Sequence, residues 1–120
     1  MNVLVIDDEL EILELIKEVL ISRGYFVTTA NSGKVAIEIL KIRDFDLVIS
    51  DFKMPNGNGL TVLNFVNSLS KKPIFFFLSG YSDLSPQDCI KAGANKFFLK
   101  PFDLEVLMNE VERIVHDRRI

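Results

Sequence analysis

Short apolar runs alternate along the chain with longer segments whose apolar residues recur at helical spacing. The runs are Val3–Ile6, Phe26–Ala30, Leu47–Ser50, Ile74–Leu78 and Phe97–Leu99. All but the second are almost purely apolar, which is typical of parallel strands that are covered on both faces. Strands that alternate with helices in this way predict an α/β domain, with a parallel sheet between two helical layers.

Five helices are predicted between and after these runs. The first follows Glu9, the second follows Ser32, the fourth is capped by Ser85, and the last opens at Asp103. The residues expected to face the core are Ile12, Leu13, Ile16, Val19 and Leu20 in the first helix; Ala36, Ile39 and Leu40 in the second; Leu60, Leu63 and Val66 in the third; and Leu104, Leu107, Met108, Val111, Ile114 and Val115 in the last. Because no linker or repeat interrupts this pattern, residues 1–120 are expected to form one doubly wound (βα)₅ domain with strand order 2-1-3-4-5.

Composition and charge narrow the class of protein. The chain has 14 Lys and Arg against 17 Asp and Glu, a formal net charge of −3, so direct binding to nucleic acid is not expected. Its only cysteine, Cys89, excludes an internal disulfide. The longest apolar stretch, Ile74–Leu78, is far shorter than the ~18 residues that a membrane helix needs. A soluble protein of the cytoplasm is therefore expected, without a membrane partner.

Polar side chains follow four of the five predicted strands. Asp7 and Asp8 follow the first, Asp51 the third, Ser79 the fourth and Lys100 the fifth. In the order 2-1-3-4-5 these four strands are neighbours, and their carboxyl ends open at the edge of the sheet where such folds bind ligands. Three carboxylates, a hydroxyl and an ammonium group are therefore predicted to meet in one crevice.

This set of groups favours phosphoryl chemistry. Three adjacent carboxylates repel one another, and a hard divalent cation such as Mg²⁺ relieves the repulsion because it prefers oxygen ligands. Together, one Mg²⁺ and Lys100 balance the formal charge of the three acids. Asp8 alone could be a helix cap, and Ser79 with Gly80 alone a turn, but their common placement at strand ends favours a site for phosphoryl transfer.

The chain resembles the receiver domains of two-component response regulators, the group that includes the chemotaxis regulator, over essentially all of its length. The matching segments, in chain order, are Asp7-Asp8-Glu9; Asp51 to Gly59, which fits D-x-x-M-P-x-x-x-G; Leu78-Ser79-Gly80; Gly93-Ala94; and Lys100-Pro101-Phe102. Each motif alone is weak, but five in order at the right spacing are specific. The resemblance implies a flavodoxin-like fold.

The resemblance also implies the chemistry of the acidic residues. Asp51 would accept a phosphoryl group from a phosphohistidine, carried by a histidine kinase or a phosphotransfer protein. Asp8 and Asp51 would bind Mg²⁺ or Mn²⁺ directly, Asp7 would do so through water, and Lys53 would contribute its backbone carbonyl. Such a domain catalyses only its own phosphorylation and dephosphorylation, so it is not expected to be an enzyme.

The other implied roles concern the phosphoryl oxygens and the output. Ser79 and Lys100 would hold those oxygens, and a cis Lys100–Pro101 bond would aim the lysine into the pocket. Ser79 and Phe97 would form a switch that alters contacts on the face made by the fourth helix, the fifth strand and the fifth helix. The partner there is an unknown downstream protein or output domain, and the chain is expected to be a monomer or a weak, phosphorylation-dependent dimer.

Several features depart from the commonest receiver pattern or leave alternatives open. The switch aromatic, Phe97, has no phenol hydroxyl, and the segment from Ser79 to Gly93 is about one residue short. Lys53 and Tyr81 lie two residues beyond Asp51 and Ser79, where they could shield an acyl phosphate from water.

The sequence leaves three alternatives to a stand-alone receiver domain. The module could be part of a longer regulator or a hybrid kinase. An aspartyl phosphatase is disfavoured because Lys53 replaces its second acid, and a flavin protein is disfavoured because the loop after the first strand is acidic.

Overall fold

Five parallel strands form one sheet in the order β2-β1-β3-β4-β5 in the computed structural model, which describes residues 1–80 and 85–119. The strands are β1 (Asn2–Ile6), β2 (Phe26–Ala30), β3 (Leu47–Asp51), β4 (Ile74–Ser79) and β5 (Lys96–Leu99). The helices are α1 (Leu10–Ser22), α2 (Gly33–Leu40), α3 (Gly59–Asn67), α4 (Pro86–Lys91) and α5 (Leu104–Arg119). The predicted doubly wound order 2-1-3-4-5 is therefore confirmed.

The helix boundaries follow from capping residues in the sequence. The side chains of Ser32, Asn58 and Ser85 each accept a hydrogen bond from a backbone N–H three residues further on, at the starts of α2, α3 and α4. Gly24 and Gly93 have φ values of 91° and 112° just beyond α1 and α4, a conformation that favours glycine and ends a helix. Local chemistry thus fixes the starts of three helices and the ends of two.

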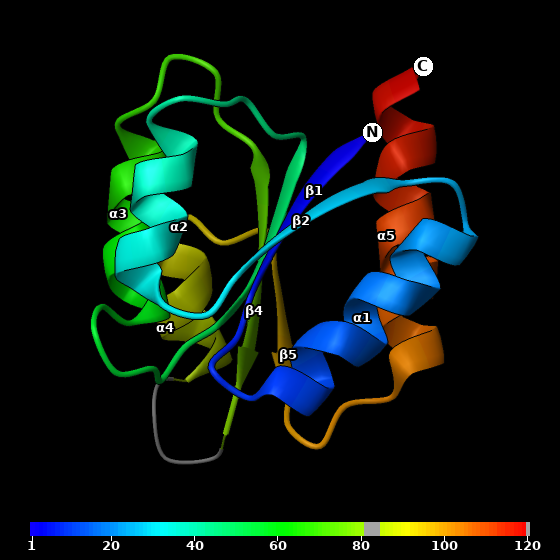
Figure 1. Ribbon diagram of the computed structural model, residues 1–120, viewed down its shortest axis with the longest axis horizontal. Coiled ribbons are helices and arrows are strands. Elements are labelled where there is room, and N and C mark those ends of the chain that lie inside the picture. The colour runs from blue at the N-terminus through cyan, green and yellow to red at the C-terminus, as the bar shows by residue number, and fades with distance from the viewer. Residues whose placement is uncertain (81–84, 120) are drawn as a thin grey trace.

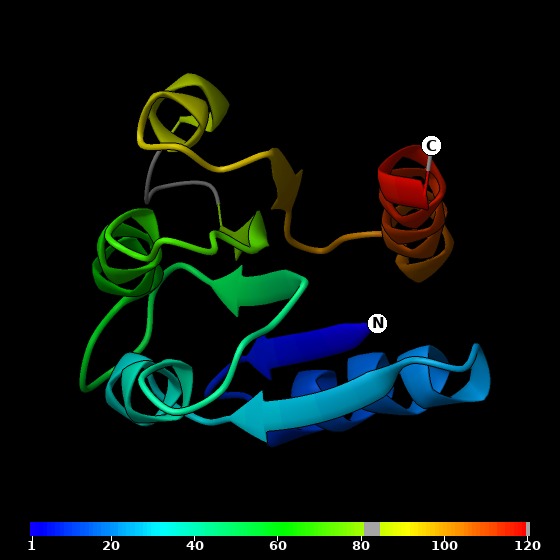
Figure 2. The ribbon, with the colours of Figure 1, turned by 90° about the horizontal axis from the view of Figure 1, so that it is seen from above.

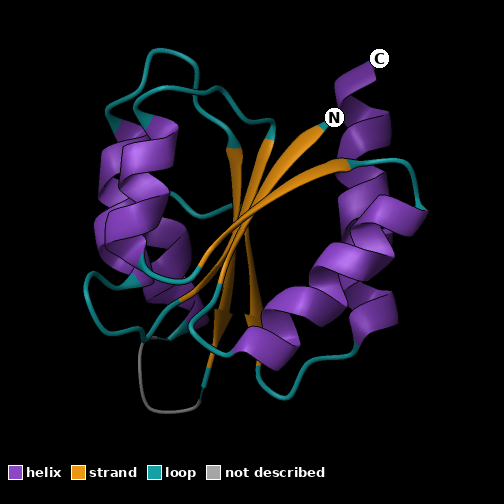
Figure 3. Ribbon diagram, viewed as in Figure 1, coloured by secondary structure: helices purple, strands orange, loops and turns teal. Residues whose placement is uncertain are grey.

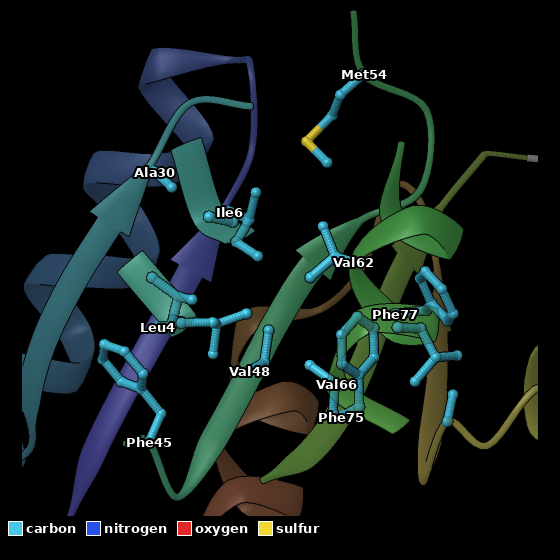
Figure 4. Packing of buried hydrophobic residues seen from close by; sticks show 14 of the residues in the cluster. Leu4, Ile6, Ala30, Phe45, Val48, Met54, Val62, Val66, Phe75 and Phe77 are labelled. Atoms are coloured by element: carbon cyan, nitrogen blue, oxygen red, sulfur yellow. The ribbon is translucent and has the colours of Figure 1, made fainter. Parts of the chain in front are cut away.

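The sheet lies between two layers of helices, α1 and α5 on one face and α2, α3 and α4 on the other (Figures 1 and 2). Alternate residues of one strand face opposite layers: Phe75 and Phe77 of β4 pack toward α3, whereas Phe76 and Leu78 pack toward α1 and α5. Figure 4 shows the hydrophobic cluster on the side of α2, α3 and α4, in which apolar strand residues meet the buried side chains of α3. Two separate hydrophobic cores thus cover the two faces of the sheet.

The last strand is less covered than its apolar sequence predicts. Complete burial was expected for Phe97–Leu99, but Leu99 is 41% exposed because β5 forms an edge of the sheet. Six side chains that were predicted to face the core are only partly buried, namely Ile12, Val19, Ile39, Leu60, Leu104 and Val115. Apolar content alone does not distinguish an edge strand from a central one.

All five strands point the same way, so their carboxyl ends gather at the lower end of the molecule in Figures 1 and 3. The chain leaves β1 there to begin α1, and leaves β3 there to begin the loop to α3. Cys89 is fully buried on the opposite side of the sheet from α1. None of the described helices is both long enough and apolar enough to cross a membrane.

Candidate functional site

The carboxyl ends of β1 and β3 bring three acidic side chains together, as the sequence predicts. Asp7 and Asp8 follow β1, and Asp51 is the last residue of β3. One carboxylate oxygen from each of the three lies within 4.8 Å of the others. Asp7 and Asp51 are buried, whereas Asp8 is exposed at the mouth. The cluster therefore combines two enclosed carboxylates with one that solvent can reach.

Backbone hydrogen bonds fix the positions of the two buried acids. The N–H of Asp7 donates to the carbonyl of Ala30, and the Asp7 carboxylate accepts a hydrogen bond of 2.8 Å from the N–H of Glu9. Beside Asp51, the N–H of Phe52 donates to the carbonyl of Leu78 on β4. Both carboxylates are thus carried on ordered strand ends, so their separation is set by the sheet.

Lys100 supplies the positive charge of the site. Its ammonium nitrogen lies 3.2 Å from Asp7 Oδ2 and 3.3 Å from Asp51 Oδ2, and its side chain is 18% exposed. The Lys100 N–H donates to the carbonyl of Ser79, and the Lys100–Pro101 peptide bond is cis. From the end of β5, the Lys100 side chain therefore extends past β4 to the acids at the ends of β3 and β1. The strand order predicts this convergence.

Burial and mutual repulsion perturb these groups in a consistent direction. Burial raises the pKa of Asp7, and burial together with the charge of Asp7 raises the pKa of Asp51 to about 6. Burial acts to lower the pKa of Lys100, but the carboxylates of Asp7 and Asp51 outweigh it and raise that pKa. In the part of the chain that the structure describes, one ammonium group contacts the acids, which leaves them short of positive charge and favours the binding of a cation.

Ser79 and Phe97 occupy the positions that the sequence suggests for them. Ser79 is the last residue of β4, is fully buried and donates a hydrogen bond of 3.3 Å to the carbonyl of Gly80. Phe97 lies on β5 and is partly buried against the cluster that packs on α2, α3 and α4. The Lys53 side chain is exposed, and Tyr81 lies outside the described residues.

The loop after Asp51 is held close to the site by glycine. A Cβ atom at Gly59 would lie 2.5 Å from the carbonyl oxygen of Asp51 and 2.6 Å from the ring of Phe77, so only glycine fits there. Two residues earlier in the loop, the carbonyl of Gly57 accepts a hydrogen bond from the N–H of Gly33, and a Cβ atom at Gly33 would lie 2.2 Å from that oxygen. This second contact, which fastens the loop to α2, was not predicted from the sequence.

Glu9 also contacts the site, a role that the sequence did not predict. Its Oε1 lies 3.5 Å from the ammonium nitrogen of Lys100, so the lysine contacts a third carboxylate at the mouth of the site. The sequence contains a sign of this contact. Glu9 directly follows the acidic pair and precedes a helix, at a position where Ser, Thr, Asp or Asn is usual.

The donors in this crevice fit a hard divalent cation. They are oxygen atoms of carboxylates, two of which have raised pKa values, and no histidine belongs to the three-acid group. Mg²⁺ and Mn²⁺ favour such ligands, whereas softer metals favour nitrogen and sulfur. The chemistry of the described residues therefore agrees with the Mg²⁺ or Mn²⁺ expected from the sequence.

Comparisons with known proteins point to one family. The model of the response regulator receiver domain matches residues 3–112. The transcriptional regulatory protein ZraR of Escherichia coli O157:H7 is 30% identical over 113 residues, which make up 93% of this chain but only 26% of ZraR. The chain therefore spans about a quarter of the length of that curated relative.

Solved structures agree with the family match. The receiver domain of the Francisella response regulator 1452 has a TM-score of 0.89 and 26% identity, with 99% of this chain and 98% of that chain covered. The response regulator protein TrrA of Thermotoga maritima, solved in complex with Mg²⁺-BeF, has a TM-score of 0.82 and 33% identity, with coverage of 93% and 96%.

Proposed function

Because the chain belongs to the response regulator receiver domain family, we propose that Asp51 is the phosphoacceptor of a two-component system. The observation that carries the proposal is the placement of the Asp51 carboxylate, which contacts Lys100 and lies beside Asp7 and Asp8. A carboxylate oxygen of Asp51 attacks the phosphorus atom of a phosphohistidine. The new O–P bond forms as the P–N bond breaks, and the imidazole nitrogen leaves with the bonding electron pair.

The neighbouring residues prepare Asp51 for this reaction. Asp8 and Asp51 would bind Mg²⁺ or Mn²⁺ directly, Asp7 would act through water, and the backbone carbonyl of Lys53 would complete the protein ligands. When bound, the cation neutralises charge on the carboxylates and on the phosphoryl oxygens. Lys100 then donates to a phosphoryl oxygen, which places fixed positive charge where the negative charge of the transition state develops.

The product is an aspartyl phosphate that signals by changing protein contacts. The Ser79 hydroxyl turns toward the phosphoryl group, and Phe97 moves into the space that it leaves. The readout surface is formed by α4, β5 and α5, where the apolar side chains of Ile90, Leu99 and Val106 are 49%, 41% and 50% exposed. Such exposed apolar side chains suit a protein partner better than a nucleic acid, whose phosphates require basic residues.

Partners follow from the two halves of this cycle. A histidine kinase or phosphotransfer protein supplies the phosphoryl group, and a downstream protein or output domain reads the α4-β5-α5 face. The chain itself is a monomer or a weak dimer that phosphorylation favours. It turns over only its own phosphoryl group, as a signalling domain of the cytoplasm rather than as an enzyme.

We assign residues 1–120 to one receiver domain. Support comes from the single sheet, to which segments from both ends of the chain contribute, and from the family match over residues 3–112. The α5 helix extends past the matched region to Arg119 and packs its buried residues against the same core as α1.

Incubation with acetyl phosphate tests the phosphoacceptor directly. Intact-mass measurement should show one added phosphoryl group when Mg²⁺ is present and none when it is chelated. Asp51→Asn should remain unmodified, whereas the control Asp44→Asn, which changes an exposed acid before β3, should be labelled like the wild type. Labelling of Asp51→Asn to the same extent as the wild type would refute the assignment.

A further inference from the structure

The Lys100 ammonium contacts three carboxylates, and only two of them belong to the acid cluster. Asp7 and Asp51 lie 3.2 and 3.3 Å from the nitrogen, and both are among the three acids that could hold a cation. Glu9 lies 3.5 Å away, is 60% exposed and does not belong to that group. Among the described residues, Glu9 is thus the partner of Lys100 that remains available when the cluster is engaged.

The side chain of Glu9 does not cap the helix that follows it. Glu9 is the N-cap residue of α1, with extended backbone angles, yet its side chain makes no capping hydrogen bond. A shorter acceptor at this position would cap the helix, as Ser32 and Asn58 do for α2 and α3. The length of Glu9 instead lets its carboxylate reach Lys100.

Charge explains why this contact matters. Asp7 and Asp51 hold Lys100 strongly while no cation is bound, but once their oxygens serve a divalent cation they offer the ammonium much less attraction. An ammonium group beside two further positive charges is repelled unless another anion stabilises it. The position that satisfies this condition is at the mouth of the site, beside Glu9.

We propose that Glu9 is a positioning residue, which holds the Lys100 ammonium at the mouth of the site while Asp51 holds the cation directly and Asp7 holds it through water. Lys100 is thereby kept within reach of an incoming phosphoryl oxygen without opposing the cation. The inference rests on the proposed function, because it assumes that the acid cluster binds Mg²⁺. It goes further by giving a role to a residue outside the cluster.

Mg²⁺ affinity measured by NMR titration of backbone amide shifts tests this role without any phosphorylation. The chain has no Trp whose fluorescence could report binding. Glu9→Gln should weaken Mg²⁺ binding about fivefold, the size expected for one partly exposed ion pair. Glu11→Gln removes the same charge from the exposed first turn of α1 and should change the affinity less than about twofold.

A double-mutant cycle separates positioning of Lys100 from direct attraction of the cation by Glu9. In a Lys100→Met background, which keeps most of the apolar stem, Glu9→Gln should change Mg²⁺ affinity less than about twofold. An equal effect of Glu9→Gln in both backgrounds would overturn the proposal, as would the absence of any effect in the wild-type background.

Glu9→Asp provides a second test that does not depend on the folding of the Lys100 variant. This change keeps the net charge but shortens the side chain and lets it cap α1, so Mg²⁺ affinity should fall as it does in Glu9→Gln. Affinity equal to the wild type would overturn the proposal. If the wild-type protein itself bound no Mg²⁺, the proposed function would fail together with this inference, whereas binding without coupling would remove only the inference.

Discussion

Removing the negative charge of Asp51 should stabilise the cation-free protein at neutral pH. Burial and the charge of Asp7 raise the pKa of this carboxyl from 3.8 to about 6. At about 1.4 kcal/mol for each pKa unit, the ionised carboxylate costs up to about 3 kcal/mol of folding free energy. Asp51→Asn removes this cost, which already includes the attraction of Lys100, so we expect a net gain of up to about 3 kcal/mol.

The sign of the pH dependence follows from the same shift. Because the folded state binds this proton more tightly than the unfolded state, the contribution of Asp51 to stability is greatest below about pH 4. That contribution declines as the pH rises from about 4 to about 6, and it stays constant above that range. The raised pKa of Asp7 acts in the same direction. The advantage of Asp51→Asn should therefore be largest at neutral pH and nearly absent near pH 4.

Urea unfolding followed by circular dichroism measures this difference, since the chain has no Trp. Asp44→Asn is the matched control, because it removes an exposed acidic charge and should change the free energy of unfolding little. Added Mg²⁺ should stabilise the wild type more than Asp51→Asn, because the variant loses a ligand. Stability of Asp51→Asn no greater than that of the wild type at neutral pH, or a gain that is equally large near pH 4, would contradict a destabilising ionised Asp51.

Three further predictions follow from the loop and the output face. Gly59→Ala should destabilise the fold by about 1–3 kcal/mol in urea unfolding, because its methyl group overlaps the Asp51 carbonyl and the Phe77 ring. Unchanged stability would show that the loop moves to make room for the methyl group. Lys53→Ala should shorten the half-life of the aspartyl phosphate by admitting water, and an unchanged or longer half-life would contradict this shielding. NMR spectra with beryllofluoride should show shifted Phe97 ring signals, whereas static signals beside a responding Asp51 would identify Phe97 as a permanent core residue.

The convergence of the acids could be predicted because it depends on short-range pattern and general topology. The residue type that follows each strand is visible in the sequence, and the common strand order places those ends side by side. Asp7, Asp51 and Lys100 therefore meet as expected. Helix starts at Ser32 and Ser85 were equally visible, since capping depends on local hydrogen bonds within a few residues.

The features that escaped prediction depend on contacts between distant parts of the chain. Gly33 and Gly57 meet because the fold brings the start of α2 and the loop after β3 together. The local sequence around either glycine does not specify the distance between them. The contact of Glu9 with Lys100 depends on which rotamer a long side chain adopts. The exposure of Leu99 depends on the absence of a sixth strand beyond β5 among the described residues, which apolar content cannot reveal.

The central claim is that Asp51 carries the phosphoryl group. Borohydride reduction of the phosphorylated protein, followed by peptide mass spectrometry, tests it most directly because it converts an aspartyl phosphate into homoserine. Homoserine is expected at position 51, only after treatment with a phosphodonor and Mg²⁺. Homoserine at Asp7 or Asp8 instead, or a modification that resists borohydride, would contradict the claim.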